Sequence, residues 1–325
     1  MPDSKVDAPG PTQDASILAT LRESPPLVGM IGLVYRPATA ALLSELTPKH
    51  RQVFALYRMG LNVGTTIAPM FGYLLILGSY NLLFWGEAAA GIIYTVIALA
   101  ALPRRGVRAG DDIAGAVRKR WAVAVFADRR YTLFLGALLI NATVYIQYVS
   151  VLPLAIRAAG IATFWYAILL TLNSAIVIGC ELLMTKMTQR WPARVVALAG
   201  FALLGCGLAL YSVPGGLLIF IAGTLVWTLA EITAGPTMSA YPANAGPAAL
   251  KSKYLSTSQA AFTLGFAIGP AIGVFAWDQV GREVWWLYGA ASLVGLVLAW
   301  YGMRPAGYSE EVEATLSHGD TAATA

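Results

Sequence analysis

The sequence has little of what soluble enzymes and metal-binding proteins are built from. Charged residues make up 12% of its 325 residues, against about 25% in soluble domains. Cys180 and Cys206 lack the spacing of a disulfide framework or a zinc site. His50 and His318 lie in a loop and in the C-terminal tail, which excludes a histidine proton relay inside a membrane. No Walker-type phosphate loop and no nucleophile elbow occurs. We therefore expect no metal, no cofactor and no enzymatic activity.

Long apolar runs take the place of these features. Hydrophobic residues reach 58% and the mean hydropathy is +0.65. Runs of about 20 apolar residues are long enough to cross a bilayer as helices. We predict an all-α, polytopic membrane protein with about nine transmembrane helices. The predicted spans are residues 27–46, 53–77, 82–102, 131–154, 164–184, 195–213, 217–241, 254–277 and 285–303.

Polar segments divide the chain into five predicted parts. These are a disordered N-terminal segment (1–26), a partial N-terminal transmembrane bundle (27–103), a basic linker (104–130), a C-terminal transmembrane bundle (131–304) and a tail (305–325). Lys and Arg gather in alternate loops, and only Arg157 and Arg282 fall on the opposite side. The positive-inside rule therefore places the linker and the tail in the cytoplasm. We expect a multi-pass protein of the cell membrane whose basic residues mark topology and do not bind nucleic acid.

Two stripes of small residues recur at four-residue spacing, each with a proline after its third member. Such a stripe lets a neighbouring helix backbone approach closely in a membrane. The repetition predicts a duplicated architecture in which residues 27–102 correspond to 217–303. The first stripe comprises Gly60, Gly64, Ala68 and Gly72, with Pro69; the second comprises Ala261, Gly265, Gly269 and Gly273, with Pro270.

The first stripe carries a resemblance to a known family. The segment 64–73 (GTTIAPMFGY) is similar to the antiporter motif G-x-x-x-G-P-x-x-G-G, from which it departs at Ala68 and Tyr73. Further matches are the segment 152–154 (LPL) and Glu231 with Pro236. Over most of residues 27–303 the chain resembles the major facilitator superfamily, and within it the drug:proton antiporter-like multidrug transporters.

This resemblance implies major facilitator-like helical bundles, with three helices of an N-terminal bundle and six of a C-terminal bundle. The spans then correspond to helices four to twelve of the family. We accordingly expect the chain to lack the first three transmembrane helices, and we expect the upstream DNA to encode about three more apolar spans.

Charged side chains inside apolar spans are costly, so each one marks a candidate functional site. Glu231 lies deep in its span and is the first candidate for proton coupling, the alternative being a structural ion pair or hydrogen bond. Glu181 is the second candidate, and snorkelling or pairing with Lys186 would also satisfy it. Arg36 is the third, as a residue of an aqueous cavity. Arg58 is expected to snorkel towards the cytoplasm.

Polar residues in the seventh family helix and the one after it are candidates for the substrate cavity. Asn141, Tyr145 and Tyr148 share one helix face, and Gln147 and Asn173 lie nearby. In the family that helix lines the central cavity, which implies contact with an amphipathic substrate. Interhelical hydrogen bonding remains the alternative. The basic residues Lys186, Arg190 and Arg194 are expected to form a cytoplasmic gate loop.

The leading functional hypothesis is a secondary active transporter that exports a small amphipathic molecule against protons by alternating access between two bundles. Its expected partners are the lipid bilayer, a small-molecule substrate and protons, with no obligate protein partner. One alternative is a truncated, non-transporting remnant or a regulatory membrane protein. Another is an importer of the same fold.

Overall fold

The structure is a computed structural model, and it describes residues 43, 50–101, 121–247 and 250–303. The described residues form helices joined by short loops and contain no strand. This confirms the predicted all-α fold class. The predicted first span (27–46), which includes Arg36, lies outside the described residues, as do the N-terminal segment, most of the linker and the tail.

Eleven α-helices and three short 3₁₀ helices are described. The α-helices are α3 (His50–Gly78), α4 (Tyr80–Ala101), α6 (Trp121–Ala127), α7 (Arg129–Tyr145), α8 (Gln147–Ser150), α9 (Leu152–Ala158), α10 (Phe164–Thr188), α11 (Ala193–Ala209), α12 (Gly216–Ala240), α13 (Lys251–Val280) and α14 (Val284–Gly302). The 3₁₀ helices are η1 (Leu210–Ser212), η2 (Tyr241–Asn244) and η4 (Gly281–Glu283).

Five helical stretches among the described residues are long and apolar enough to cross a membrane. They are Arg129–Ser150, Phe164–Thr188, Ala193–Ser212, Gly216–Asn244 and Lys251–Gly302, the last containing both α13 and α14. A shorter apolar stretch, Phe84–Ile97, lies in α4. The count of nine spans therefore remains a prediction.

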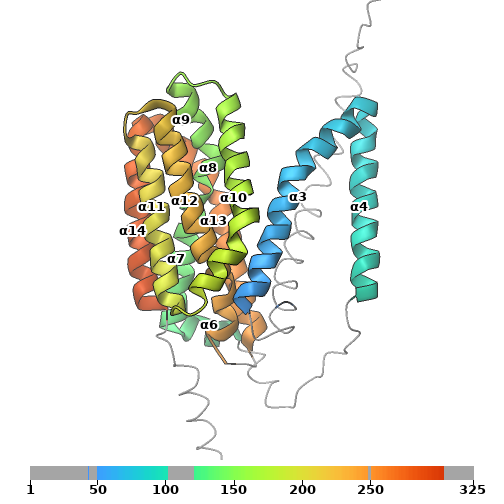
Figure 1. Cartoon of the computed structure of the whole chain (residues 1–325). Coiled ribbons are helices and arrows are strands. Elements are labelled where there is room, and N and C mark those ends of the chain that lie inside the picture. Colours follow the sequence, from blue (N-terminus) through green and yellow to red (C-terminus); the bar gives the residue numbers. More distant parts are fainter. Residues whose placement is uncertain (1–42, 44–49, 102–120, 248–249, 304–325) are drawn as a thin grey trace, which may run out of the picture.

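The helices from α7 to α14 form one bundle, and α3 and α4 stand to one side of it (Figure 1). Within the bundle α11 packs between α12 and α14, while α7 packs against α13 and α14. Large aromatic side chains fill its interior: Trp227, Trp285 and Tyr211 are each at most 1% exposed. The polar residues described below lie on the helices of this bundle and on α3.

The second glycine stripe is the contact surface between α13 and α7. A Cβ on Gly265 would lie 2.6 Å from the Leu139 carbonyl oxygen, and one on Gly269 would collide with the Ile146 side chain. Only glycine allows the two backbones to approach this closely. The regular pattern of α7 ends at Tyr145, and α8 begins at Gln147. The second stripe therefore packs as the sequence predicts.

The first stripe does not show the packing that was expected of it. No described atom outside α3 lies within 4 Å of a Cβ built on Gly60 or Gly64, and Ala68 is exposed. Gly72 is half-buried, and Pro69 lies within α3. The two stripes are thus similar in sequence, but among the described residues only the second is packed closely against another helix.

α3 meets the bundle at its N-terminal end and diverges from it towards α4 (Figure 1). Phe54 is 1% exposed and packs with Ala240, Ala243 and Leu255. The guanidinium of Arg51 donates hydrogen bonds to the carbonyl oxygen of Thr188 at 3.0 Å and to that of Trp191 at 3.1 Å. These contacts join α3 to the end of the bundle that the charge distribution predicts to be cytoplasmic.

Candidate functional site

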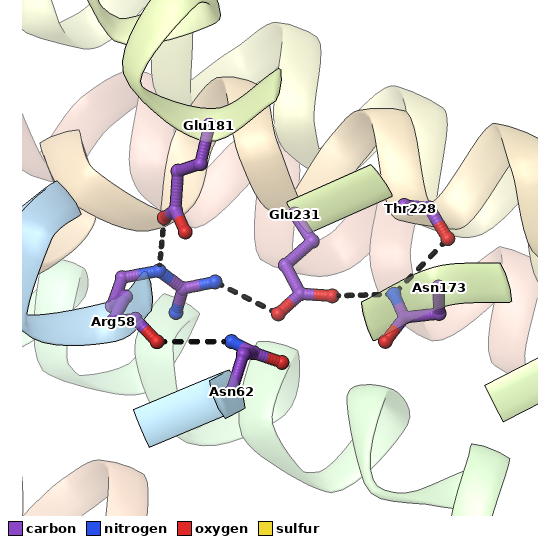
Figure 2. Close-up of polar contacts among 6 residues, drawn as sticks. All are labelled: Arg58, Asn62, Asn173, Glu181, Thr228 and Glu231. Atoms are coloured by element: carbon purple, nitrogen blue, oxygen red, sulfur yellow. Dashed lines mark hydrogen bonds and ion pairs between the residues drawn. The ribbon is translucent and has the colours of Figure 1, made fainter. Parts of the chain in front are cut away.

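Three charged side chains from three helices meet where α3 crosses α10 and α12. Arg58 Nε lies 2.6 Å from Glu181 Oε1, and Arg58 Nη2 lies 2.8 Å from Glu231 Oε1 (Figure 2). The side chains are 20%, 0% and 7% exposed for Arg58, Glu181 and Glu231. We call these residues the charge triad. A guanidinium is suited to this arrangement because it offers several donors in a planar fork.

Neutral side chains complete the hydrogen bonding around the triad. Asn173 Nδ2 donates to Glu231 Oε2 at 2.9 Å and contacts Thr228 Oγ1 at 3.1 Å (Figure 2). Asn62, one turn after Arg58, donates from Nδ2 to the Arg58 carbonyl oxygen at 3.1 Å. Asn173 therefore fixes the Glu231 carboxylate from the side opposite to Arg58.

The triad contains two carboxylates and one guanidinium, so its ionised form carries one surplus negative charge. A buried charge without a partner is costly in a protein interior and more so in a membrane. One added proton, or one added monovalent cation, brings the sum to zero. In its fully ionised form the triad is therefore one positive charge short of neutrality.

A cavity of about 150 Å³ opens beside the triad. Arg58 and Glu231 are the charged residues that line it, while Glu181 does not reach it. Its other described walls combine aromatic rings with a few polar groups. The aromatic residues are Phe54, Tyr57, Tyr145, Phe201, Trp227 and Phe262, and the polar ones are Asn141, Ser239, Ser258 and Gln259.

Several residues that were predicted separately from the sequence as site candidates lie close together in the structure. Glu181 and Glu231 share Arg58, and Asn173 binds Glu231. Asn141 and Tyr145 line the cavity. The ring of Tyr148 stacks on Trp227, 5.3 Å between centroids, and also packs edge-on against Tyr145. Tyr148 thus supports the aromatic wall from behind and does not line the cavity itself.

For Gln147 the structure shows the alternative, interhelical hydrogen bonding, and not a place at the substrate cavity. Its side chain is fully buried between α7 and α13, where Nε2 donates to the carbonyl oxygens of Thr143 at 2.7 Å and Gly269 at 2.9 Å. The Oε1 atom accepts a hydrogen bond from Ser150 at 2.7 Å. Gln147 therefore connects two helices and lies away from the cavity.

The expectation for Arg58 is also wrong. Its guanidinium points into the bundle towards two carboxylates, because the attraction of two buried negative charges outweighs hydration at the cytoplasmic surface. Glu181 likewise pairs with Arg58 and not with Lys186. A usable indication existed in the sequence, since two acidic residues within spans require a cationic partner.

The predicted cytoplasmic gate loop lies where α10 connects to α11. Lys186 is in the last turn of α10 and Arg190 is exposed. The Arg194 guanidinium lies 3.9 Å from the ring centroid of Trp300, a cation–π contact. The direct connection to α3 comes from Arg51, bound to the Thr188 and Trp191 carbonyls. A role in gating remains a prediction for the three basic residues.

A comparison of the sequence with known proteins gives consistent results. A family model described as Major Facilitator Superfamily matches residues 26–256. A Na(+), Li(+), K(+)/H(+) antiporter of Planococcus maritimus is 25% identical over 304 residues, covering 84% of this chain and 72% of that protein. Two uncharacterized MFS-type transporters of Bacillus subtilis, YqjV and YttB, are 23% and 21% identical. The match covers 78% of this chain in both cases, and 63% and 65% of the two relatives.

Solved structures with the same fold support this result. A double-tryptophan mutant of XylE aligns with a TM-score of 0.59 and 14% identity, over 84% of this chain and 69% of that one. The human organic anion transporter MFSD10 (TETRAN) aligns with a TM-score of 0.52 and 14% identity, over 81% and 67%. These likenesses concern the fold alone. With the family match over most of its length, the chain belongs to the Major Facilitator Superfamily, a superfamily of membrane transporters.

Proposed function

We propose that the chain is a proton-coupled antiporter in which the charge triad takes up and releases the coupling proton. The observation that carries this proposal is the sharing of one guanidinium, Arg58, between two buried carboxylates, Glu181 and Glu231. Two strongly interacting carboxylates titrate as a coupled pair, so the site binds one proton at a time. Whether the proton is bound decides how strongly the carboxylates of α10 and α12 attract Arg58 of α3.

The proposed substrate is a small amphipathic molecule, and the proposed direction is export from the cell. Aromatic walls beside a charged edge suit a ligand with both an apolar body and a polar group. The Tyr145 and Trp227 rings offer the apolar surface, and Glu231 offers the polar contact. We expect the protein to work in the cell membrane with protons and substrate alone, without a cofactor or an obligate protein partner.

A second candidate is exchange of a monovalent metal cation for a proton. The surplus negative charge of the triad favours it, and the name of the Planococcus maritimus relative is that of a cation/H⁺ antiporter. A metal ion would need oxygen ligands, which Glu231 and Asn141 offer at the cavity wall. In this case the aromatic lining would have no direct part in recognition.

Reconstitution of the full chain in liposomes with an imposed pH gradient tests the proposal. A panel of fluorescent amphipathic dyes is compared with sodium, lithium and potassium salts, and proton movement is followed with a pH-sensitive dye. We expect substrate-dependent dissipation of the gradient by the native chain, and its loss in the double variant Glu181→Gln/Glu231→Gln. The control is Glu87→Gln, which removes an exposed carboxylate in α4.

The outcomes separate the candidates. Dissipation with dyes alone supports export of amphipathic molecules, and dissipation with metal salts alone supports the second candidate. Flux that ignores the pH gradient, or a double variant that keeps the coupled flux, overturns the proposal. The absence of any flux by the native chain would favour a non-transporting membrane protein.

A further inference from the structure

Trp227, which forms part of the aromatic cavity wall, has its only polar atom bound outside the cavity. Its Nε1 donates a hydrogen bond to the hydroxyl oxygen of Tyr211 at 2.8 Å. Tyr211 belongs to η1, is 1% exposed and is not one of the residues that line the cavity. The single polar atom of an indole can donate a hydrogen bond but cannot accept one. The part of Trp227 that borders the cavity is therefore its hydrocarbon surface.

Tyr211 is held in place by further contacts of its own. Its hydroxyl group also forms a hydrogen bond with Thr224 Oγ1 at 2.8 Å. Its ring stacks on Phe220, with 5.3 Å between centroids, and packs edge-on against Trp285 at 4.8 Å. Thr224 and Trp285 are completely buried, and Phe220 is 2% exposed. The acceptor for the Trp227 N–H thus has a fixed position inside the bundle, away from bulk water.

Two glycines allow α11 and α12 to approach closely enough for this hydrogen bond. A Cβ on Gly223 would collide with the Tyr211 ring and would lie 2.7 Å from the Gly207 carbonyl oxygen. A Cβ on Gly207 would lie 2.6 Å from the Trp227 backbone nitrogen. Only glycine fits where two backbones approach this closely. Backbone packing therefore supports the placement of Tyr211 beside Trp227.

The rings on the other sides of Trp227 do not replace the hydrogen bond. Tyr148 stacks on Trp227 at 5.3 Å between centroids, and Tyr145 lies edge-on to it at 5.9 Å. These contacts restrict the plane of the indole ring. A hydrogen bond requires an aligned donor, so it also determines where the N–H points within that plane. The Tyr211 hydroxyl supplies this second restraint.

We propose that Tyr211 is a specificity-determining residue that acts through Trp227. By accepting the indole N–H, Tyr211 keeps this part of the cavity wall apolar, and so favours ligands with an apolar body. Tyr211 does not contact the ligand itself and is therefore a positioning residue. This inference rests on the proposed function, in which the cavity binds an amphipathic molecule. It adds the residue that sets the preference for the apolar part of that molecule.

The physical reason is the cost of leaving a buried donor without an acceptor. Without the Tyr211 hydroxyl, the Trp227 N–H loses the acceptor that it has among the described residues. An apolar ligand in the cavity would then shield the N–H from water and offer no acceptor in its place, which is unfavourable. A ligand that carries an acceptor would be affected less.

The substitution that tests the proposal is Tyr211→Phe, which keeps the ring contacts with Phe220 and Trp285 and removes the acceptor. Thr224→Val is its matched control, because it removes the other hydrogen bond of the same hydroxyl and leaves the one from Trp227 in place. Each substitution removes a buried hydrogen bond, so both should lower the midpoint of thermal unfolding. Only Tyr211→Phe should change the ligand preference.

The measurement is equilibrium binding of two organic cations of equal charge to the purified full chain, at a temperature at which all variants are folded. The compounds are tetraphenylphosphonium and (4-methoxyphenyl)triphenylphosphonium, which adds an ether oxygen as an acceptor. We expect Tyr211→Phe to weaken binding of tetraphenylphosphonium about tenfold, as one buried donor left without its acceptor implies. The methoxy compound should lose less affinity, so the ratio of the two affinities shifts. Thr224→Val should leave this ratio unchanged.

A double-mutant cycle tests whether the effect depends on Trp227. Trp227→Phe keeps an aromatic ring at this position but has no N–H group. Adding Tyr211→Phe to Trp227→Phe should therefore leave the ratio of the two affinities unchanged.

Three results overturn the role of Tyr211 alone: native affinity for tetraphenylphosphonium in Tyr211→Phe, an equal loss for both compounds, or a shift in the ratio that persists in the Trp227→Phe background. A native chain that binds neither compound overturns the proposal that this cavity takes amphipathic molecules, and the role of Tyr211 fails with it.

Discussion

Arg58 lies against the position in α12 where Gly235 has no side chain. A Cβ on Gly235 would lie 2.6 Å from Arg58 Cζ and 2.8 Å from Nε. The guanidinium reaches Glu231 only because this part of the helix surface is bare. The close approach, and not the ion pairs alone, therefore positions Arg58 between its two partners.

Gly235→Ala should weaken transport without unfolding the protein. The added methyl group pushes the guanidinium away from at least one carboxylate, and a change of about 1.4 kcal/mol in this contact corresponds to a tenfold change in rate. We expect about a tenfold loss of pH-driven flux in liposomes. Gly179→Ala is the control, since no described atom outside its own helix lies within 4 Å of a Cβ there. Equal flux in the two variants would contradict this role of Gly235.

The two glycine stripes should respond differently to added bulk. Gly269→Val places a branched side chain against Ile146 and the Thr143 carbonyl, 3.2 Å from the Cβ position. We expect a strong loss of monodisperse protein in detergent. Gly64→Val should express like the native chain, because the described residues leave its surroundings open. Poor yield of Gly64→Val would show that Gly64 packs against a segment outside the described ranges.

Gln147→Leu should lower stability with little effect on substrate recognition. The substitution keeps the bulk but removes the hydrogen bonds to the Thr143 and Gly269 carbonyls. A buried polar group left without its partner costs about 1–3 kcal/mol. Thermal denaturation in detergent should show a lower midpoint, and dye binding at a temperature where the protein is folded should be unchanged. A variant with native stability and altered dye affinity would instead place Gln147 at the substrate.

Arg51→Ala should open the cytoplasmic end of the cavity. It removes two hydrogen bonds from α3, one to Thr188 at the end of α10 and one to Trp191 in the connection to α11. Hydrogen bonds to charged groups contribute about 1.5–3 kcal/mol, so the open form should become about tenfold more populated or more. The measurement is labelling of Ser239→Cys, a cavity position, by a membrane-impermeant thiol reagent from the cytoplasmic side. The exposed Cys180 and Cys206 must first be replaced by Ala.

The control for this experiment is Arg190→Ala, which removes the same charge from an exposed position on the same side. Its labelling rate should match that of the parent. A rate that rises equally in both variants would attribute the effect to surface charge and not to the contacts of Arg51.

The sequence was sufficient for the fold class and for most helix positions. α10 begins at Phe164, where the predicted span begins, and α12 begins one residue before its predicted start at Leu217. These positions follow from apolar runs bounded by polar or glycine residues, which is local information. The break between α7 and α8 was not predicted. No proline or glycine marks it. One of the two carbonyls to which Gln147 donates belongs to Gly269 of α13, which is distant in the sequence.

The site was predicted in part, for a physical reason. Glu181 and Glu231 stand out because a carboxylate in an apolar run is costly wherever it lies. The role of Arg58 was not predicted, because an arginine near a span end can be stabilised either by hydration or by an acidic partner. Which of the two applies depends on how α3 packs against the bundle. Gly235 could not be identified at all. Its importance depends on the Arg58 side chain that lies opposite it in the folded chain.

The connection made by Gln147 has a mechanical consequence. Its amide donates to one carbonyl on each of two helices, so a slide of one residue, about 1.5 Å, would break it. Gly265 and Gly269 add steric interlocking, because the α7 backbone fills the space where their side chains would be. α3, in contrast, is held to the bundle by the buried Phe54 and by the long, flexible side chains of Arg51 and Arg58. We therefore expect α3 to move relative to the bundle more readily than α7 slides along α13.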